Sequence, residues 1–336
     1  MLERFVGSEF FENKCFGLRK HIPYFNSKYI ELNGLGEAWQ DPELFERAQE
    51  ALVNLKSATQ EKEHASSEIP KIIWMYWNTP ISSAPDVVRM SIESWTKLNP
   101  DYEVRLLNDE NITEALGFDF NAVFELCFVK LTLAIKADVL RLYLLSRFGG
   151  VWADSTTFCL EPLSHWLPKC IGLHNFFTFR HKTVVARPLE VWFIAAEKHS
   201  EITRNTLNLF IEHLFKPRNI ALFVSNRRKM LRKLGYEKHH PDILYADTVT
   251  LAENFGFMPY FSFGYFLNES LRKYFSCDEI EQFLALPNNH AINDSDYTQF
   301  VGAVVSKQTY KDSYQQSSLY QKRRQYLVDV LEELVK

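Results

Sequence analysis

The chain lacks several features that identify common protein classes. Its 336 residues include five cysteines, none of them in a C-x-x-C spacing: Cys15, Cys127, Cys159, Cys170 and Cys277. An odd number of scattered cysteines predicts neither a disulfide framework nor a zinc site. No apolar run approaches the ~20 residues that cross a bilayer, and the first residues, MLERFVGSEFFENK, lack the apolar core of a signal peptide. A formal net charge of −4 gives no indication of nucleic-acid binding.

Glycine is also scarce, at 12 residues, and the sequence has no Gly-x-Gly-x-x-Gly and no Walker loop. Any phosphate group would have to be held in another way. The composition, 46% hydrophobic and 24% charged, is that of a globular protein with a large core. Together with the missing membrane span and leader, it predicts a cytoplasmic protein that at most touches the inner face of the cytoplasmic membrane.

A β-α-β pattern follows a polar, helical N-terminal region. Residues 69–77 and 102–108 read as strands, and residues 85–98 between them read as a helix that begins near Pro85. Within the N-terminal region, residues 41–56 form an amphipathic helix behind Asp41-Pro42. We therefore predict a helical extension (1–66), an α/β domain (67–312) and a C-terminal amphipathic helix (313–336).

Residues 130–157 are the most informative stretch of the sequence. Apolar residues occupy nearly every face of a predicted helix that ends at Gly149-Gly150, so the helix should be buried almost all round. Asp138 and Arg141 interrupt it at positions i and i+3, where they are neighbours on one face. A structural ion pair would explain these two residues if they stood alone.

Asp154 follows directly after the short strand 151–153. Ligands of open α/β sheets bind at the carboxyl ends of strands, where a carboxylate can reach a sugar hydroxyl, a ribose or a metal ion. A turn or helix-capping role is the alternative for Asp154 alone. The helix with an embedded acid and base, immediately upstream, favours a functional site.

This stretch resembles the DXD-type sugar transferases, and within them the capsular polysaccharide synthesis proteins. That family carries Lys/Ser-x-Asp-x-x-Arg and then Gly-Gly-x-Trp/Tyr-x-Asp-x-Thr/Asp. The matching residues are Lys136, Asp138, Arg141, Gly149, Gly150, Trp152, Asp154 and Thr156. Weaker similarity in residues 69–80, 91–109, 192–202 and 247–260 extends the resemblance over most of residues 69–311.

The resemblance implies an α/β fold of the GT-A type, with a Rossmann-like central sheet that binds a nucleotide sugar. It also implies a set of donor-binding residues, which are Trp77, Lys136, Asp138, Arg141, Asp154, Thr156 and Lys307. Among these, Asp154, Asp138 and Arg141 are the expected catalytic residues. Trp77, at the end of the first strand, would stack on the base, although a strand-end Trp is more often a core residue. Lys307 or Lys311 would neutralise the donor diphosphate.

The second acid of the DXD motif is replaced by Thr156. That acid commonly ligates Mn²⁺ or Mg²⁺, and a neutral hydroxyl is a weaker ligand. Asp154 alone is then the expected metal ligand, with low affinity, and metal dependence stays open.

The function predicted from these residues is glycosyl transfer of a hexose or N-acetylhexosamine. The donor would be a UDP-sugar, and the acceptor a growing capsular or other surface polysaccharide, free or lipid-linked. The resemblance suggests retention at the anomeric carbon and contact with capsule assembly machinery. Two alternatives remain, which are transfer of a sugar phosphate and a scaffold that binds nucleotide sugar or glycan without turnover.

The C-terminal segment repeats apolar residues on one predicted helical stripe, which are Leu319, Tyr326, Leu327, Val330, Leu331 and Leu334. Lys322, Arg323 and Arg324 lie beside the stripe. A helix docked on the domain is one interpretation, and a basic amphipathic helix on the inner membrane surface is the other.

Overall fold

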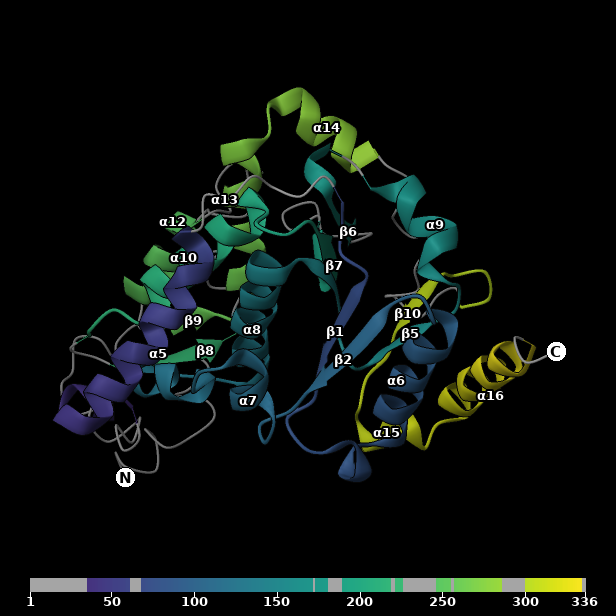
Figure 1. Ribbon diagram of the computed structural model, residues 1–336, viewed down its shortest axis with the longest axis horizontal. Coiled ribbons are helices and arrows are strands. Elements are labelled where there is room, and N and C mark those ends of the chain that lie inside the picture. Colours follow the sequence, from purple (N-terminus) through teal and green to yellow (C-terminus); the bar gives the residue numbers. More distant parts are fainter. Residues whose placement is uncertain are drawn as a thin grey trace, which may run out of the picture.

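The structure is a computed structural model that describes residues 35–60, 68–171, 173–180, 189–218, 221–225, 246–254, 257–285 and 300–333. A five-stranded sheet lies at its centre, with helices on both faces (Figure 1). The predicted α/β class is confirmed. The boundary predicted between the helical extension and the α/β domain, at residues 66–67, lies outside the described residues.

The predicted β-α-β unit is present with slightly shorter elements. It consists of β1 (Ile72–Tyr76), α6 (Asp86–Leu98) and β2 (Glu103–Leu107). Strands β1 and β2 pair in parallel, and on its other side β1 pairs in parallel with β4 (Gly150–Ala153). The central sheet has the order β2-β1-β4-β7-β6, in which β7 (Leu189–Ala196) and β6 (Phe176–Arg180) are antiparallel to their neighbours. Its first three strands therefore carry the Rossmann-like arrangement.

Apolar side chains cover both faces of this sheet. Successive residues of a strand point to opposite faces, so Trp152 joins the core on one side while Val151 and Ala153 join the core on the other. The first core is packed by α5 (Pro42–Gln60), α8 (Leu133–Phe148), α10 (Glu201–Leu214) and α13 (Ser262–Tyr274), and the second by α6, α9 (Leu163–Cys170) and α16 (Ser318–Glu333). Burial on both faces explains why the strands read as nearly continuous hydrophobic runs.

The informative helix is α8 (Leu133–Phe148), which packs against α10 (Glu201–Leu214) and α5 (Pro42–Gln60). Most of α8 is buried as predicted, but its first residue is not, because Leu133 is 52% exposed. The predicted helix in the N-terminal region is α5, which begins after Asp41 and runs four residues further than expected. The Asp41 carboxylate caps α5 by accepting hydrogen bonds from the backbone N–H groups of Glu43 and Leu44.

Two small sheets complete the fold. Strand β5 (Thr157–Cys159) pairs antiparallel with β10 (Val305–Lys307), so Lys307 lies opposite Thr157. The other sheet joins β3 (Val129–Lys130), β8 (Leu222–Ser225) and β9 (Phe257–Pro259) in parallel. The first of these sheets brings a segment from late in the chain to the end of β4.

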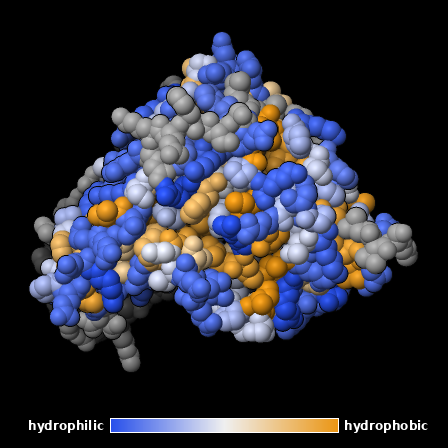
Figure 2. Space-filling model, viewed as in Figure 1, coloured by the Kyte–Doolittle hydropathy of each residue, from blue (hydrophilic) through white to orange (hydrophobic). Residues whose placement is uncertain are grey.

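Further helices surround this framework. The α-helices are α7 (Ile112–Leu116), α9 (Leu163–Cys170), α12 (Ala246–Asn254), α13 (Ser262–Tyr274), α14 (Cys277–Ala285) and α15 (Asp312–Gln315). The 3-10 helices are η1 (Glu37–Trp39), η2 (Ile81–Ser83), η3 (Phe120–Leu126) and η4 (Leu173–Asn175). Much of the face in Figure 2 is hydrophilic, with hydrophobic residues gathered toward its middle.

The C-terminal helix, α16 (Ser318–Glu333), packs against α6. Leu327 and Leu331 are buried as the stripe requires, but Leu319 is 42% exposed and Tyr320 takes the buried position instead. The Tyr320 hydroxyl donates a hydrogen bond of 2.7 Å to Asp86, at the start of α6. The structure supports the docked-helix interpretation, because the apolar stripe faces the domain.

Two further expectations concern the cysteines and the membrane. Cys127, Cys159, Cys170 and Cys277, the cysteines among the described residues, are free. Within the same part of the chain, no helix is both long enough and apolar enough to cross a membrane.

The turn between α8 and β4 depends on Gly149 and Gly150, which have φ angles of 69° and 99°. The Trp74 indole N–H bonds the Gly149 carbonyl at 2.9 Å, so the turn is fixed against β1. A Cβ at Gly150 would lie 2.6 Å from the Ile72 carbonyl oxygen. No small movement of a side chain relieves a clash with backbone.

Gly150→Ala should therefore lower the free energy of unfolding by about 3 kcal/mol, the sum of left-handed strain and overpacking. Gly117→Ala is the matched control, because Gly117 has a φ of 76° but no atom within 4 Å of the added Cβ. It should cost only about 1 kcal/mol. Urea unfolding followed by tryptophan fluorescence measures both, and equal losses would contradict this account of the turn.

Candidate functional site

Trp77 and Asp154 follow two neighbouring parallel strands, β1 and β4, so they lie at the same edge of the central sheet. The Ser155 hydroxyl donates a hydrogen bond to the Tyr76 carbonyl, which joins the two strand ends directly. This carboxyl edge is where open α/β sheets bind ligands.

Asp154 is at the centre of a polar network. Its Oδ1 accepts hydrogen bonds of 2.8 Å from Arg141 Nη2 and from the Trp152 indole N–H. Its Oδ2 accepts a hydrogen bond of 2.7 Å from Lys307 Nζ. Burial, the largest influence, would raise the pKa of Asp154, but the Lys307 and Arg141 cations outweigh it and hold the pKa below its usual value. Asp154 is therefore an ionised carboxylate between two cations.

Arg141 links this carboxylate to α8. Its guanidinium is 3% exposed and lies over the rings of Trp152 and Phe263, at 4.9 Å and 5.3 Å from their centroids. A second hydrogen bond goes from Nη1 to the Val191 carbonyl on β7. These contacts fix the plane of the guanidinium, which presents its remaining Nη2 side to the two acids.

Asp138 is the second acid, with Oδ1 at 3.4 Å from Arg141 Nη2. It is 8% exposed. Burial raises the pKa of the Asp138 carboxyl to about 7, and the Asp154 charge acts in the same direction, while Arg141 opposes both. The predicted i, i+3 pair is thus present, but a single guanidinium is shared by two carboxyl groups.

Lys307 and Thr156 complete the network. Lys307 Nζ lies 2.8 Å from the Thr156 hydroxyl as well as 2.7 Å from Asp154. The neighbouring Gln308 N–H bonds the Thr156 carbonyl at 2.7 Å, which aligns β10 with the motif. Of the two lysines proposed from sequence, Lys307 reaches Asp154, whereas Lys311 is exposed before α15.

Trp77 lies beside this network and is partly buried. Its ring packs edge-to-face on Tyr310, with the centroids 5.5 Å apart and the planes at 73°. Tyr310 is 58% exposed. The two rings form an aromatic corner at the sheet edge, three residues along the chain from Lys307. Trp74, in the middle of β1, is buried.

Lys136 does not join the network. Its ammonium lies 5.4 Å from the centroid of the Phe124 ring, on η3. Residues two apart on a helix face different directions, so Lys136 and Asp138 cannot share one side of α8. The donor-binding role expected for Lys136 stays a prediction, without a contact that brings it to Asp154.

Tyr260 is a site residue that the motifs did not indicate. It follows β9 and is 40% exposed. Burial raises the pKa of the Tyr260 hydroxyl, and the charges of Asp138 and Asp154 raise it further. Tyr260 is therefore within electrostatic range of both acids. Two weak signals in the sequence were its position at the end of the faintly similar stretch 247–260 and its place directly after a strand.

The network is a poor match to a divalent cation. Mn²⁺ and Mg²⁺ prefer several oxygen ligands, carboxylates above all. Among the described residues, no group of three His, Cys, Asp or Glu side chains is placed to hold a metal ion. Both oxygens of Asp154 already accept hydrogen bonds from cationic or indole N–H groups. The residues at this site do not fit a metal.

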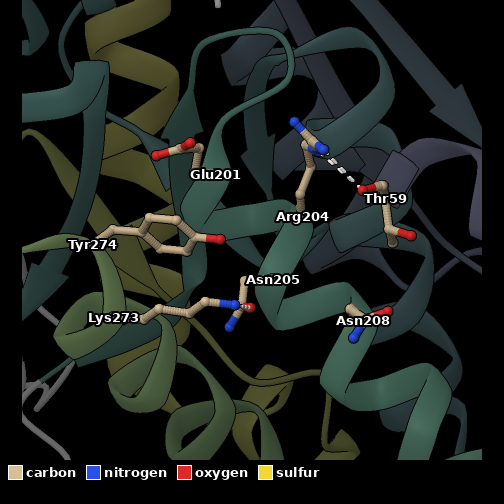
Figure 3. Close-up of a pocket in the computed structure, with 7 residues that line it drawn as sticks. All are labelled: Thr59, Glu201, Arg204, Asn205, Asn208, Lys273 and Tyr274. Carbon is tan, nitrogen blue, oxygen red and sulfur yellow. Dashed lines mark hydrogen bonds between the residues drawn. The ribbon is translucent and has the colours of Figure 1, made fainter. Parts of the chain in front are cut away.

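A separate cavity of about 220 Å³ lies between α5, α10 and α13 (Figure 3). Its lining is polar and includes Thr59, Glu201, Arg204, Asn205, Asn208, Lys273 and Tyr274. Several of these groups already bond one another: Arg204 donates to the Thr59 carbonyl at 2.9 Å, and Lys273 to Asn205 at 2.7 Å. The Asp154 network, with buried charges at a sheet edge, is the stronger candidate.

Residues 37–225 match the model of the family described as capsular polysaccharide synthesis protein. The match covers more than half of the 336 residues. The chain belongs to this family. The family expected from the central motif is confirmed. Asp138, Arg141 and Asp154 lie inside the matched residues, whereas Tyr260 and Lys307 lie beyond them.

Several curated proteins are similar over shorter stretches. The chain is 33% identical over 105 residues to inositol phosphoceramide mannosyltransferase 3 of Schizosaccharomyces pombe, covering 30% of this chain and 29% of that protein. It is 25% identical over 160 residues to the putative glycosyltransferase HOC1 of Saccharomyces cerevisiae, covering 43% and 40%. The initiation-specific alpha-1,6-mannosyltransferase of Candida albicans is 27% identical over 150 residues, covering 42% and 39%.

These relatives support the glycosyltransferase class, which is the coarser part of the predicted function. The chain spans at most 40% of the length of these three proteins. Among solved structures, the PaToxG glycosyltransferase aligns with 88% of this chain and 98% of its own, at 17% identity and a TM-score of 0.29. At that score the likeness carries no argument about the fold.

Burial gives Asp138 a measurable, pH-dependent effect on the stability of the folded chain. The unfolded chain ionises Asp138 near the ordinary pKa of an aspartate, whereas the folded chain keeps its proton until about pH 7. Between these values the folded state binds more protons, so the contribution of Asp138 to stability falls as the pH rises.

Asp138→Asn removes the ionisable group, and with it the loss of stability that comes from ionising a buried carboxyl. The urea midpoint of this variant minus that of the parent chain should therefore increase as the pH is raised from about 5 to about 7, and level off near pH 8. Asp86→Asn is the control, because Arg324 and Tyr320 outweigh burial and lower the pKa of Asp86, so that carboxylate stays ionised over the same range. A flat difference for Asp138→Asn would show that the carboxyl is ionised throughout.

Proposed function

We propose that this chain is a glycosyltransferase that moves a hexose or N-acetylhexosamine from a nucleotide diphosphate sugar to a growing surface glycan. The observation that carries the proposal is the Asp154 network at the carboxyl edge of β1 and β4. It places hydrogen-bonding acids, a guanidinium and an ammonium beside an aromatic corner. These are the groups needed to hold a sugar, a diphosphate and a base.

The order of these groups along the edge supports one orientation of the donor. The base stacks at the corner formed by Trp77 and Tyr310. The diphosphate lies beside Lys307, and the sugar hydroxyls bond Asp138, Arg141 and Asp154. The partly exposed Tyr260 then faces the sugar from the side of β9. A nucleotide sugar bound in this orientation contacts each charged side chain of the network.

The reaction forms a bond between the acceptor oxygen and the anomeric carbon, and breaks the bond from that carbon to the diphosphate. The leaving diphosphate takes the electron pair of the broken bond, and the proton of the acceptor hydroxyl ends on it. Negative charge thus develops at the diphosphate, where cationic side chains stabilise the transition state more than the ground state. Retention at the anomeric carbon remains part of the proposal, and the anomeric NMR signal of the product tests it.

The names of the relatives favour a hexose, because three are mannosyltransferases, in Schizosaccharomyces pombe, Candida albicans and Saccharomyces cerevisiae. A UDP-sugar is the donor expected from sequence. A thermal-shift panel of UDP, GDP and CDP with their sugars identifies the base, since ligand binding raises the stability of the folded state. Release of a nucleoside monophosphate in place of a diphosphate would instead identify a sugar-phosphate transferase.

Asp154→Asn should lower kcat/KM for transfer at least about a hundredfold, because the amide loses one acceptor oxygen and leaves two cations without their carboxylate. Asp101→Asn is the matched control. Asp101 is also paired with a lysine, at 2.7 Å from Lys71 Nζ, but it lies before β2, at the opposite edge of the sheet. Nucleoside diphosphate release measures both variants, and full activity of Asp154→Asn would overturn the site assignment.

A further inference from the structure

Lys307 lies between the two side chains that the Asp-x-Thr motif would offer to a metal ion. Its ammonium bonds the first motif residue, Asp154, at 2.7 Å and the third, Thr156, at 2.8 Å. A single cation thus bridges the two side chains that the motif offers. Lys307 comes from β10, 153 residues beyond Asp154 in sequence, so this bridge is a product of the fold.

The remaining contacts leave little room for another cation at this position. Asp154 Oδ1 accepts two hydrogen bonds and Oδ2 accepts the one from Lys307. Asp138, the second acid of the network, has its own Oδ1 3.4 Å from Arg141. A divalent ion would have to displace the Lys307 ammonium and would gain a single carboxylate and a neutral hydroxyl, which is a weak ligand set.

The Lys307 ammonium is also accessible to a ligand. Its side chain is 24% exposed, compared with 4% for the side chain of Arg141. An ammonium has three N–H donors, and two of them are used by Asp154 and Thr156. Within the part of the chain that the structure describes, no contact uses the third, so it can bond an incoming oxygen. Tyr310, three residues along the same segment, packs on Trp77 and sets this donor beside the aromatic corner.

We propose that Lys307 is the cation that receives the donor diphosphate, in place of a divalent metal ion. The inference rests on the proposed function and adds the chemistry of the phosphate subsite to it. As the bond to the anomeric carbon breaks, the leaving phosphate oxygen gains charge and the third Lys307 N–H bonds it. Asp154 and Thr156 keep the ammonium in place, so no cation has to be bound from solution.

Isothermal titration calorimetry tests this inference apart from turnover. The purified full chain is titrated with UDP and with uridine, and in parallel with GDP and guanosine, first in EDTA and then in Mn²⁺. The parent chain should bind one nucleoside diphosphate in EDTA with a Kd within about twofold of its value in Mn²⁺. A charge-assisted bond to phosphate contributes about tenfold or more to affinity.

Lys307→Met should therefore weaken diphosphate binding at least about tenfold in both solutions while the affinity for the nucleoside stays unchanged. Lys307→Arg, which keeps the charge, should retain most of the affinity. Lys311→Met is the control, because Lys311 is an exposed lysine four residues along the same segment. Its affinities should equal those of the parent chain.

The double variant Thr156→Asp with Lys307→Ala provides an independent readout. It restores two carboxylates in the DXD spacing and removes the resident ammonium, so its diphosphate binding should become dependent on Mn²⁺. This dependence on Mn²⁺ is measured by binding alone, so the test does not require an assay for the activity of the parent chain.

Two results would overturn the role of Lys307. One is diphosphate binding by the parent chain in Mn²⁺ only, and the other is Lys307→Met with unchanged or uniformly weakened affinities for diphosphate and nucleoside. A parent chain that binds neither pair of ligands in either solution would instead overturn the proposed function itself. The two failures are therefore distinguishable.

Discussion

A charged group removed from water has to be paired, and the candidate site is organised around that requirement. Asp138, Arg141, Asp154 and Lys307 form a row of alternating acids and bases with side chains largely out of solvent. Asp138 and Arg141 lie on α8, Asp154 follows β4, and Lys307 lies on β10, so the row connects these three elements. The same contacts that satisfy the buried charges also hold these three elements in register. Recognition and stability are therefore difficult to separate at this edge of the sheet.

The backbone makes the row possible. The Gly149-Gly150 turn joins α8 directly to β4, and the residue after β4, Asp154, accepts a hydrogen bond from Arg141 in the middle of α8. Trp152, on the strand between them, lies under the guanidinium and also donates to Asp154. One tryptophan thus serves the core with its ring and the site with its N–H group. This double use explains why the motif combines small, aromatic and acidic residues in so short a span.

Much of the local structure could be predicted from sequence, because periodicity and capping determine it. The β-α-β unit, the start of α5 and the buried middle of α8 follow the predicted pattern, whereas the exposed Leu133 and Leu319 depend on how helices pack at their ends. Within the site, Asp138, Arg141 and Asp154 lie in one stretch and are visible as a motif. Tyr260 follows β9, whose position is set by its pairing with β8, and no spacing in the sequence encodes that pairing. The competition between two acids for one guanidinium likewise depends on three-dimensional distance.

The pairing of β10 with β5 has a consequence for the order in which the molecule is made. A ribosome has synthesised the whole of the family-matched region, with Asp138, Arg141 and Asp154, long before it reaches residues 305–307. Until then β5 has an open edge and Asp154 has only one of its two cations. Completion of the site is therefore a late event in biosynthesis. Before β10 docks, Asp154 is paired with Arg141 alone and β5 has no partner strand. Docking of β10 supplies the second cation and the partner strand together.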